Sequence, residues 1–545
     1  MNFDYKAKLI LALISLSLIS LPALSETNNE RFISAEELIP GEDGYGLTVL
    51  RGDSIIHFPV KYIGTINKVE PNRDLILIRL IGDPFEHTGI IAGMSGSPIY
   101  FRGRLLGALA YGWAFSKDPI AGVTSIKLMK KLIEEQSMDT SAVNGMIPLS
   151  APLWVSGLPV DRTGAAWSRI DGLGFLSAPA GRTLGKQSLE PGSAVGVKLI
   201  DGDISMTAIG TVTYVEDSNV IAFGHPFLNR GISRLPMCGA IIETIMPSQQ
   251  ISFKLGSASE NVGVMLRDGD PGISGMVGPT ASMLPMTVEL KTFWGEKKFS
   301  YTIAKDYVLT PQLIDIAWSA SAQSGLFAKG AAGVEVAVRI FKDEKIIELR
   351  DRGVVSNSPL EVMPTLPVTL LFENPFQKFF PDRIEVEVTA DQDLRRGKIY
   401  GVRALRGAVK PGETLPIEVL LRVYDEGERI ERIDIPIPEG MNEGTIQVTV
   451  TGGRGFARSE LAQPRTLQDL MKTLAEYEPS NMLVAQITSS SGLLTETDRG
   501  ILPSLPPTVQ RIQRGRTTKP NSIWQKESTD IPISGIGSVR VEVKE

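Results

Sequence analysis

Residues 45–81 read YGLTVLRGDSIIHFPVKYIGTINKVEPNRDLILIRLI. Apolar and polar residues alternate within three runs of this stretch, and the turn-forming sequences RGDS and EPNR separate the runs. Alternation with a period of two is typical of a strand that buries one face. The stretch therefore predicts three successive β-strands.

The residues that follow predict the rest of a first β unit. Residues 100–111 read YFRGRLLGALAY, which is typical of a hairpin. Residues 124–136 then change to helical spacing, with the apolar side chains on one face. We expect residues 26–140 to form this unit.

Later segments predict further β-rich regions. A length of 545 residues agrees with three or four domains at about 150 residues per domain. The strand pattern resumes at Ala194, and short strands at even spacing after about residue 375 are typical of a β-sandwich. The predicted order is a connecting segment over 141–185, a second β unit over 186–300, a connecting helix and hairpin over 301–372, a β-sandwich-like domain over 373–455, and a helix, mobile linker and terminal strand over 456–545.

Composition excludes several classes of function. The net charge is −6, so the chain has no basic footprint for nucleic acid. The only cysteine is Cys238, and the three histidines are His57, His87 and His225. These residues lie far apart and form no CxxC or HExxH pattern, which argues against zinc and haem sites. We therefore expect no metal and no cofactor.

The amino terminus reads as a secretory signal. Residues 1–25 contain Lys6 and Lys8, then an apolar run over 9–21, then the small residues Ala23 and Ser25. This pattern predicts export, and an exported chain without disulfides favours the periplasm or cell envelope of a bacterium. The alternative is an uncleaved anchor, in which case the segment would contact the membrane.

A glycine-flanked serine is the strongest candidate for chemistry. Residues 93–98 read GMSGSP. Glycines on both sides of Ser95 allow a tight turn that exposes the hydroxyl and directs neighbouring N–H groups to one point. Ser95 is therefore a candidate nucleophile, with the amides of Gly93 and Ser95 as oxyanion donors. The alternative is an ordinary turn of a β protein.

A serine nucleophile needs a base and an acid that orients it. His225 follows a predicted strand and precedes a proline, so it is the candidate base. His87 is the reserve candidate, and His57, in the middle of a strand, is expected to be structural. Asp83 is the candidate acid, although an Asp-Pro pair is also a common turn former.

These segments together resemble a known family. Residues 83–98, DPFEHTGIIAGMSGSP, strongly resemble the serine-containing half of the SpoIVB peptidase family. Residues 210–225, with GTVTYV and AFGH, are similar to its histidine segment, and residues 263–278 to the glycine-containing stretch after it. The resemblance spans about 45–295 and implies a mainly β, chymotrypsin-like double β-barrel with a triad of Ser95, His225 and Asp83. In the sporulation peptidase the histidine half comes first, so the halves are here in permuted order.

The expected function is that of an exported serine endopeptidase that cleaves a protein or peptide substrate in the cell envelope. Self-processing that releases the C-terminal region is a further possibility. The alternative is a catalytically silent envelope binding or scaffold protein that uses the same fold.

Overall fold

The computed structural model describes residues 31–70, 73–134, 147–148, 151–158, 165–182, 185–326, 331–355, 365–441, 443–453, 464–489, 495–497, 500–502 and 523–544. The predicted signal segment and most of the predicted mobile linker lie outside these residues. Within them, no helix has both the length and the apolar character needed to cross a membrane.

The chain divides into two compact units. Unit 1 comprises Met1–Trp154, Ala180–Val197 and Ala208–Thr280, and unit 2 comprises Val155–Pro179, Lys198–Thr207 and Ala281–Glu545. The boundary predicted at residue 300 for the second β unit is therefore too late, because unit 1 ends at Thr280. Strand patterning marks strands, but it does not say to which sheet a strand belongs.

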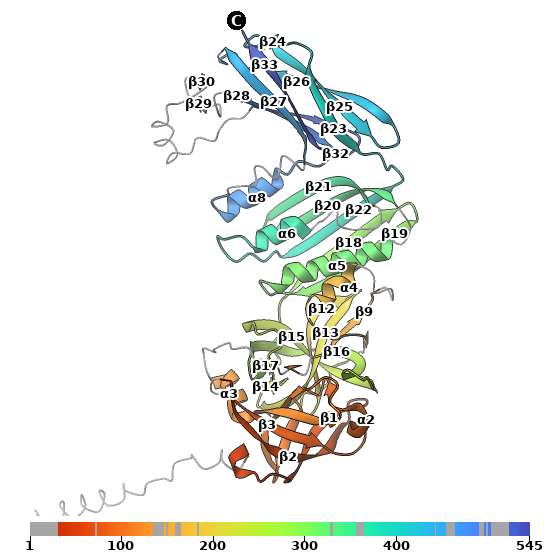
Figure 1. Ribbon diagram of the computed structural model, residues 1–545, viewed down its shortest axis with the longest axis vertical. Helices are drawn as coiled ribbons and strands as arrows, with labels where there is room; N and C mark the ends of the chain where they lie inside the picture. The colour runs from red at the N-terminus through yellow and green to blue at the C-terminus, as the bar shows by residue number, and fades with distance from the viewer. Residues whose placement is uncertain are drawn as a thin grey trace, which may run out of the picture. The chain divides into compact units, whose positions relative to one another are not determined.

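The first half of unit 1 is a closed β-barrel (Figure 1). Its strands are β1 (Asp43–Val49), β2 (Ile55–Glu70), β3 (Arg73–Leu80), β5 (Pro98–Phe101), β6 (Arg104–Gly112) and β7 (Ile120–Ser125). They pair in the order β1-β2-β3-β7-β6-β5, and pairing of β5 with β1 closes the ring. Phe58, Ile78 and Phe101 are among the buried side chains that fill its interior. The strands predicted over 45–81 are confirmed.

The second half of unit 1 is another closed barrel. Its strands are β12 (Ala194–Gly202), β13 (Ser205–Glu216), β14 (Asn219–Ala222), β15 (Gly231–Met246), β16 (Ser252–Gly269) and β17 (Gly272–Val277). Of the first two, Ala194–Val197 and Ala208–Glu216 belong to unit 1. They pair in the order β12-β13-β14-β17-β16-β15, and β12 closes the ring by pairing with both β13 and β15. The two barrels thus share one strand order, and the prediction of a mainly β, double-barrel fold is confirmed.

One helix packs against both barrels. Helix α3 (Ile126–Glu134) contacts β6 of the first barrel and β14 and β17 of the second. Its buried residues Ile126, Met129 and Leu132 share a core cluster with Leu105 and Ile221. The helix predicted over 124–136 is confirmed, and its apolar stripe serves packing.

Shorter elements occupy the segment predicted as a plain connection over 141–185. They are β8 (Ile147–Pro148), β9 (Leu153–Ser156), α4 (Ala165–Asp171), β10 (Ser177–Pro179) and β11 (Gly181–Arg182). In unit 1, β8 extends the first sheet beside β6, and fully buried Trp154 donates through Nε1 to the carbonyl of Lys254 at 2.9 Å. The segment is therefore partly structured, although its small residues obscure the periodicity.

Unit 2 begins with a sheet covered by helices. The sheet contains β18 (Met283–Thr292), β19 (Gly295–Ala304), β20 (Ala332–Lys342), β21 (Lys345–Val355) and β22 (Arg383–Asp391), and its helices are α5 (Leu309–Gly325) and α6 (Thr365–Phe372). The hairpin predicted within 301–372 corresponds to β20 and β21. β22 was expected in the β-sandwich, but it pairs with β18 and β20.

A β-sandwich follows, built from two sheets around one core. One sheet contains β23 (Gly397–Ala404), β25 (Thr414–Val423), β26 (Gly427–Pro436) and β32 (Ile533–Ser534), and the other β24 (Ala408–Val409), β27 (Gly444–Gly452), β28 (Met482–Ser489), β31 (Ile523–Ser528) and β33 (Ile536–Val543). The predicted limits 373–455 are wrong, because strands after residue 480 complete the sandwich. The remaining elements are η1 (Ala35–Glu37), α2 (Phe85–Thr88), β4 (Ile91–Ala92), α8 (Leu467–Ala475), β29 (Thr495–Thr497) and β30 (Gly500–Leu502).

Candidate functional site

Ser95 lies on a tight turn between the third and fourth strands of the first barrel, β3 and β5. The amide of Ser97 donates to the carbonyl of Met94 at 2.9 Å, and the amide of Gly96 donates to the carbonyl of Leu109 at 2.7 Å. Gly93 and Gly96 both have positive φ angles, +94° and +95°. The two glycines flanking the serine motif therefore permit the turn, as the sequence predicted.

The second barrel holds this turn in place. Two threonine hydroxyls on β13 donate to its carbonyls, Thr211 to Gly93 at 2.9 Å and Thr213 to Gly96 at 2.7 Å. The amide of Thr211 also donates to the carbonyl of Ser95 at 2.7 Å. The fit is tight, because a Cβ atom on Gly96 would lie 1.9 Å from the Thr211 carbonyl oxygen. The conformation of the Ser95 turn thus depends on both barrels.

The Ser95 side chain is fully buried, and its hydroxyl has no hydrogen-bond partner among the described residues. The Ser97 hydroxyl, on the same turn, shares both properties. The Ser95 amide takes no part in the hydrogen bonds of the described loops and turns, and the oxyanion role of Gly93 and Ser95 stays a prediction. Most buried polar atoms in native proteins are hydrogen-bonded, so an unpartnered hydroxyl requires an explanation.

His225 lies on the equivalent connection of the second barrel, between its third and fourth strands, β14 and β15. The residue is 2% exposed, and its Nδ1 lies 2.7 Å from the carbonyl oxygen of Pro226. A carbonyl oxygen only accepts, so Nδ1 carries the hydrogen in this contact. In a neutral ring that tautomer leaves the lone pair on Nε2, the nitrogen that receives the proton in a serine–histidine pair.

Residues next to Ser95 and His225 are in contact across the two barrels. A Cβ atom on Gly96 would lie 2.5 Å from the amide nitrogen of Phe223, two residues before His225. In the opposite direction, the Thr124 hydroxyl of the first barrel donates to the carbonyl of Gly224 at 2.6 Å. The structure therefore brings the serine turn and the histidine loop together, without a hydrogen bond from the Ser95 hydroxyl.

Asp83 lies apart from this pair. It is exposed, just before helix α2, and no hydrogen bond or ion pair within the described residues joins it to His225. The other two histidines are also exposed: His57 is on β2, as predicted for a strand residue, and His87 is on α2. The structure thus places the loops that carry Ser95 and His225 in contact, while the triad itself stays a prediction, and Asp83 lies apart from both loops.

A different aspartate contacts the histidine loop. Asp268, at the end of β16, is 0% exposed. Its carboxylate accepts from the amides of Phe227 at 2.7 Å, Leu228 at 2.8 Å and Arg230 at 3.1 Å. Burial raises the pKa of the Asp268 carboxyl, against the lowering effect of these backbone donors. Sequence reasoning missed Asp268 because residues 268–272, DGDPG, are typical of a turn.

A buried lysine lies beside the serine turn. Lys254 on β16 is 0% exposed, and its Nζ donates to the hydroxyls of Thr48 at 3.0 Å and Thr211 at 3.4 Å. A Cβ atom on Gly93 would lie 3.1 Å from Lys254 Cδ. Burial alone lowers the pKa of Lys254 to about 7, since the partners of its amine are neutral hydroxyls. A buried amine of this kind is a common feature of functional sites.

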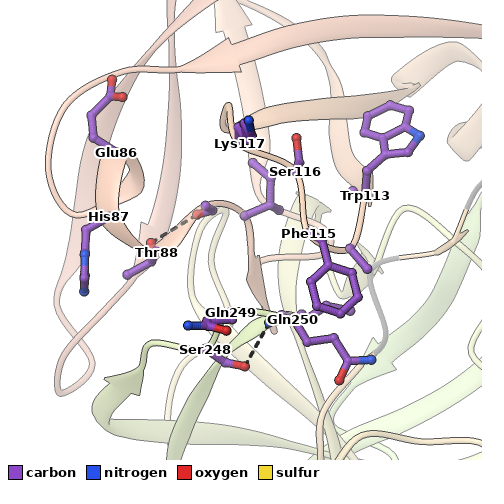
Figure 2. Close-up of a pocket in the computed structure, with 15 residues that line it drawn as sticks. Glu86, His87, Thr88, Trp113, Phe115, Ser116, Lys117, Ser248, Gln249 and Gln250 are labelled. Carbon is purple, nitrogen blue, oxygen red and sulfur yellow. Dashed lines mark hydrogen bonds between the residues drawn. The ribbon is translucent and has the colours of Figure 1, made fainter.

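A pocket opens at residues 86–90, the segment that leads through β4 into the serine turn (Figure 2). Its volume is about 150 Å³. Three segments line it, 86–90 just before β4, 112–117 after β6, and 248–251 just before β16. The amide of Phe115 donates to the carbonyl of Gln250 at 3.4 Å, which links two of these segments. His87 lines the pocket, whereas Ser95 and His225 are not among the described residues that line it.

The described residues contain no group of histidine, cysteine, aspartate and glutamate side chains that could hold a metal ion. The single cysteine, Cys238, is buried and forms no disulfide. The double barrel and the residues around Ser95 therefore define the candidate site by themselves. Comparison of the chain with family models, curated proteins and solved structures finds no match in any of the three.

Proposed function

We propose that this protein is a serine peptidase in which Ser95 is the nucleophile and His225 the general base. One observation carries the proposal: a fully buried serine hydroxyl without a hydrogen-bond partner lies on a turn that the histidine-bearing barrel holds in shape. An unsatisfied buried hydroxyl costs about 1–3 kcal/mol. Ser97 bears the same cost, so what singles out Ser95 is its place between Gly93 and Gly96, on a turn that touches the histidine loop.

The chemistry follows from the arrangement of donors and acceptors. His225 holds its Nδ1–H against a backbone carbonyl and so presents Nε2 as the proton acceptor. Removal of the Ser95 proton produces the alkoxide that attacks a peptide carbonyl. The amides of Gly93 and Ser95 then face the oxyanion, and each such donor contributes about 3–4 kcal/mol to transition-state stabilisation.

The structure holds this site in a closed form. Ser95 is 0% exposed, so no substrate reaches its hydroxyl until the serine turn or the histidine loop moves. The pocket of Figure 2 lies next to the segment that leads into the turn and contains exposed Phe115. It offers a place for a substrate side chain once the turn has opened.

A fluorophosphonate probe tests the proposal, because it modifies only an activated serine. Wild-type protein, incubated over a range of pH and in mild denaturant to open the site, is expected to gain one adduct at Ser95 by mass spectrometry. Ser95→Ala is expected to abolish the adduct, and His225→Ala to slow its formation by about 100-fold or more. Ser97→Ala is the matched control, since Ser97 is equally buried and unpartnered on the same turn, and it is expected to react like the wild type.

Two results contradict the proposal in different ways. If the adduct persists in Ser95→Ala and disappears in Ser97→Ala, the nucleophile is Ser97 and the assignment of Ser95 is wrong. Complete absence of labelling favours the second candidate, a binding or scaffold protein that keeps the fold without turnover. The full burial of Ser95 is the observation that favours that candidate. The mass of the exported protein tests self-processing, since cleavage shortens the wild type and leaves Ser95→Ala intact.

A further inference from the structure

The Asp268 carboxylate and the His225 ring are connected through one peptide group. Asp268 Oδ1 accepts the N–H of Phe227 at 2.7 Å, and His225 Nδ1 lies 2.7 Å from the carbonyl oxygen of Pro226. That carbonyl and that N–H are the two ends of the single peptide bond between Pro226 and Phe227. The peptide bond is planar and resists rotation. The position of the Phe227 N–H therefore fixes the position of the oxygen that contacts His225.

The rest of the loop is held by the same side chain. Asp268 Oδ2 accepts from the amides of Leu228 and Arg230, so with Phe227 one buried carboxylate satisfies three backbone donors within five residues of His225. Hydrogen bonds to an ionised group are shorter and about twice as strong as neutral ones. Arg230, which lies on this loop, also acts on the carboxylate electrostatically. Asp268 thus determines the conformation of the segment that contacts the imidazole.

Strand order places Asp268 on the histidine barrel. It ends the fifth strand, β16, and the histidine follows the third, β14. Asp83, in contrast, belongs to the serine barrel and is exposed. The aspartate that resembles the family's acid is therefore not the one that contacts the histidine loop.

We propose that Asp268 is the positioning acid of this site and acts on His225 through the Pro226–Phe227 peptide group. The inference rests on the proposed function for its catalytic meaning. The carboxylate polarises the peptide N–H, which makes the carbonyl oxygen at the other end a better acceptor. A better acceptor at Nδ1–H stabilises the protonated imidazole and keeps the proton off Nε2 in the neutral ring. In this relay one peptide group connects the Asp268 carboxylate to the imidazole.

The test compares Asp268→Asn with Asp83→Asn in the full chain. Only three histidines are present, so His57→Gln and His87→Gln assign the imidazole signals in spectra of protein labelled with ¹⁵N-histidine. Asp268→Asn is expected to move the His225 titration to lower pH and to slow fluorophosphonate labelling at least tenfold. Asp83→Asn is expected to match the wild type in both measurements.

The outcomes separate the relay from the peptidase activity. If the wild type is never labelled, the proposed function fails, while the His225 titration still decides the relay. A folded Asp268→Asn protein with an unchanged His225 titration overturns the relay, and so does a shift caused by Asp83→Asn. If Asp268→Asn does not fold, the wild type is used instead. The NMR signal of its Phe227 amide proton is expected far downfield, and its chemical shift is expected to change as His225 titrates. A Phe227 amide chemical shift that stays constant while His225 titrates overturns the proposal.

Discussion

The two barrels of unit 1 have the same strand order, and each presents a candidate residue on the connection between its third and fourth strands. They differ in what holds that connection. The histidine loop receives one hydroxyl from the first barrel, Thr124, but three of its amides bind Asp268, a carboxylate from its own barrel. The serine turn is bonded to β6 of its own barrel, but its side-chain donors come from the other barrel: the hydroxyls of Thr211 and Thr213, with the Lys254 amine behind Thr211.

This difference separates two tasks. A loop held from within its own barrel keeps its shape while the barrels move relative to one another during opening. A turn held by the other barrel changes its shape when the contact between the two barrels, here called the junction, changes. We therefore expect the serine turn to be the part of the site that responds to opening, and the histidine loop to be the fixed part.

The largest expected effect comes from the serine turn. Gly96→Ala places a Cβ atom 1.9 Å from the Thr211 carbonyl oxygen and 2.5 Å from the Phe223 amide nitrogen, at a positive φ angle. We expect the free energy of unfolding to fall by more than about 4 kcal/mol. Gly103→Ala is the control, because its φ angle is also positive but its surroundings are open, so about 1–2 kcal/mol is expected. Chemical denaturation measures the free energy of unfolding of both variants. Equal decreases in Gly96→Ala and Gly103→Ala would contradict the tight fit between the serine turn and the second barrel.

Lys254 is expected to make stability depend on pH. Its pKa is lowered from 10.5 to about 7, so between these values the unfolded chain binds a proton that the folded chain does not. The free energy of unfolding of the wild type therefore rises with pH in this window, by up to about 1.4 kcal/mol per pH unit relative to Lys254→Met. The free energy of unfolding of Lys254→Met therefore exceeds that of the wild type by the largest amount near pH 7.

Denaturation curves at several pH values between 7 and 9.5 measure this difference. Lys61→Met is the matched control, because Lys61 pairs with Asp43 on the exposed surface of the first barrel. Its curves are expected to run parallel to those of the wild type. If the Lys254→Met curves also run parallel to those of the wild type, burial does not lower the pKa of Lys254, and the amine behind the serine turn is not a special feature of that side of the site.

The threonine contacts across the junction have the smallest expected effect. Thr213→Val removes the donor to the Gly96 carbonyl, and Thr124→Val removes the donor to the Gly224 carbonyl. Each is expected to lower the free energy of unfolding by about 1–3 kcal/mol, because a buried carbonyl loses its partner. Thr244→Val, at an exposed hydroxyl, is the control and is expected to stay within about 0.5 kcal/mol of the wild type.

Labelling rates then sharpen the comparison. If only the serine turn responds to opening, Thr213→Val speeds fluorophosphonate labelling and Thr124→Val does not. Equal acceleration by both variants would show that the two connections open together.

Much of the fold could be predicted because alternation and turn signals are local. The strands over 45–81, the helix after β7 and the Thr466 cap of α8, whose hydroxyl accepts from the Asp469 amide at 3.0 Å, all follow from short-range patterns. Partners were harder to predict. The pattern of β22 fits a sandwich strand equally well, and only pairing with β18 and β20 assigns it to another sheet.

The site shows the same limit. The turn at Ser95 and the strand end before His225 could be predicted, because glycines and a local strand pattern mark them. Lys254 could not, since the stretch ISFKLG suggests that its apolar residues face inward, whereas the structure buries Ser252, Lys254 and Gly256. Asp268 was missed because hydrogen bonds to a distant loop leave no trace in the residues next to it.

The threonine contacts also bear on how the protein is made. The serine turn is synthesised first, and β13, which carries Thr211 and Thr213, follows more than a hundred residues later. A nascent chain that ends before β13 holds Ser95 in a loop without these donors. The serine turn therefore acquires these hydrogen bonds only when the second barrel, which also carries His225, has folded.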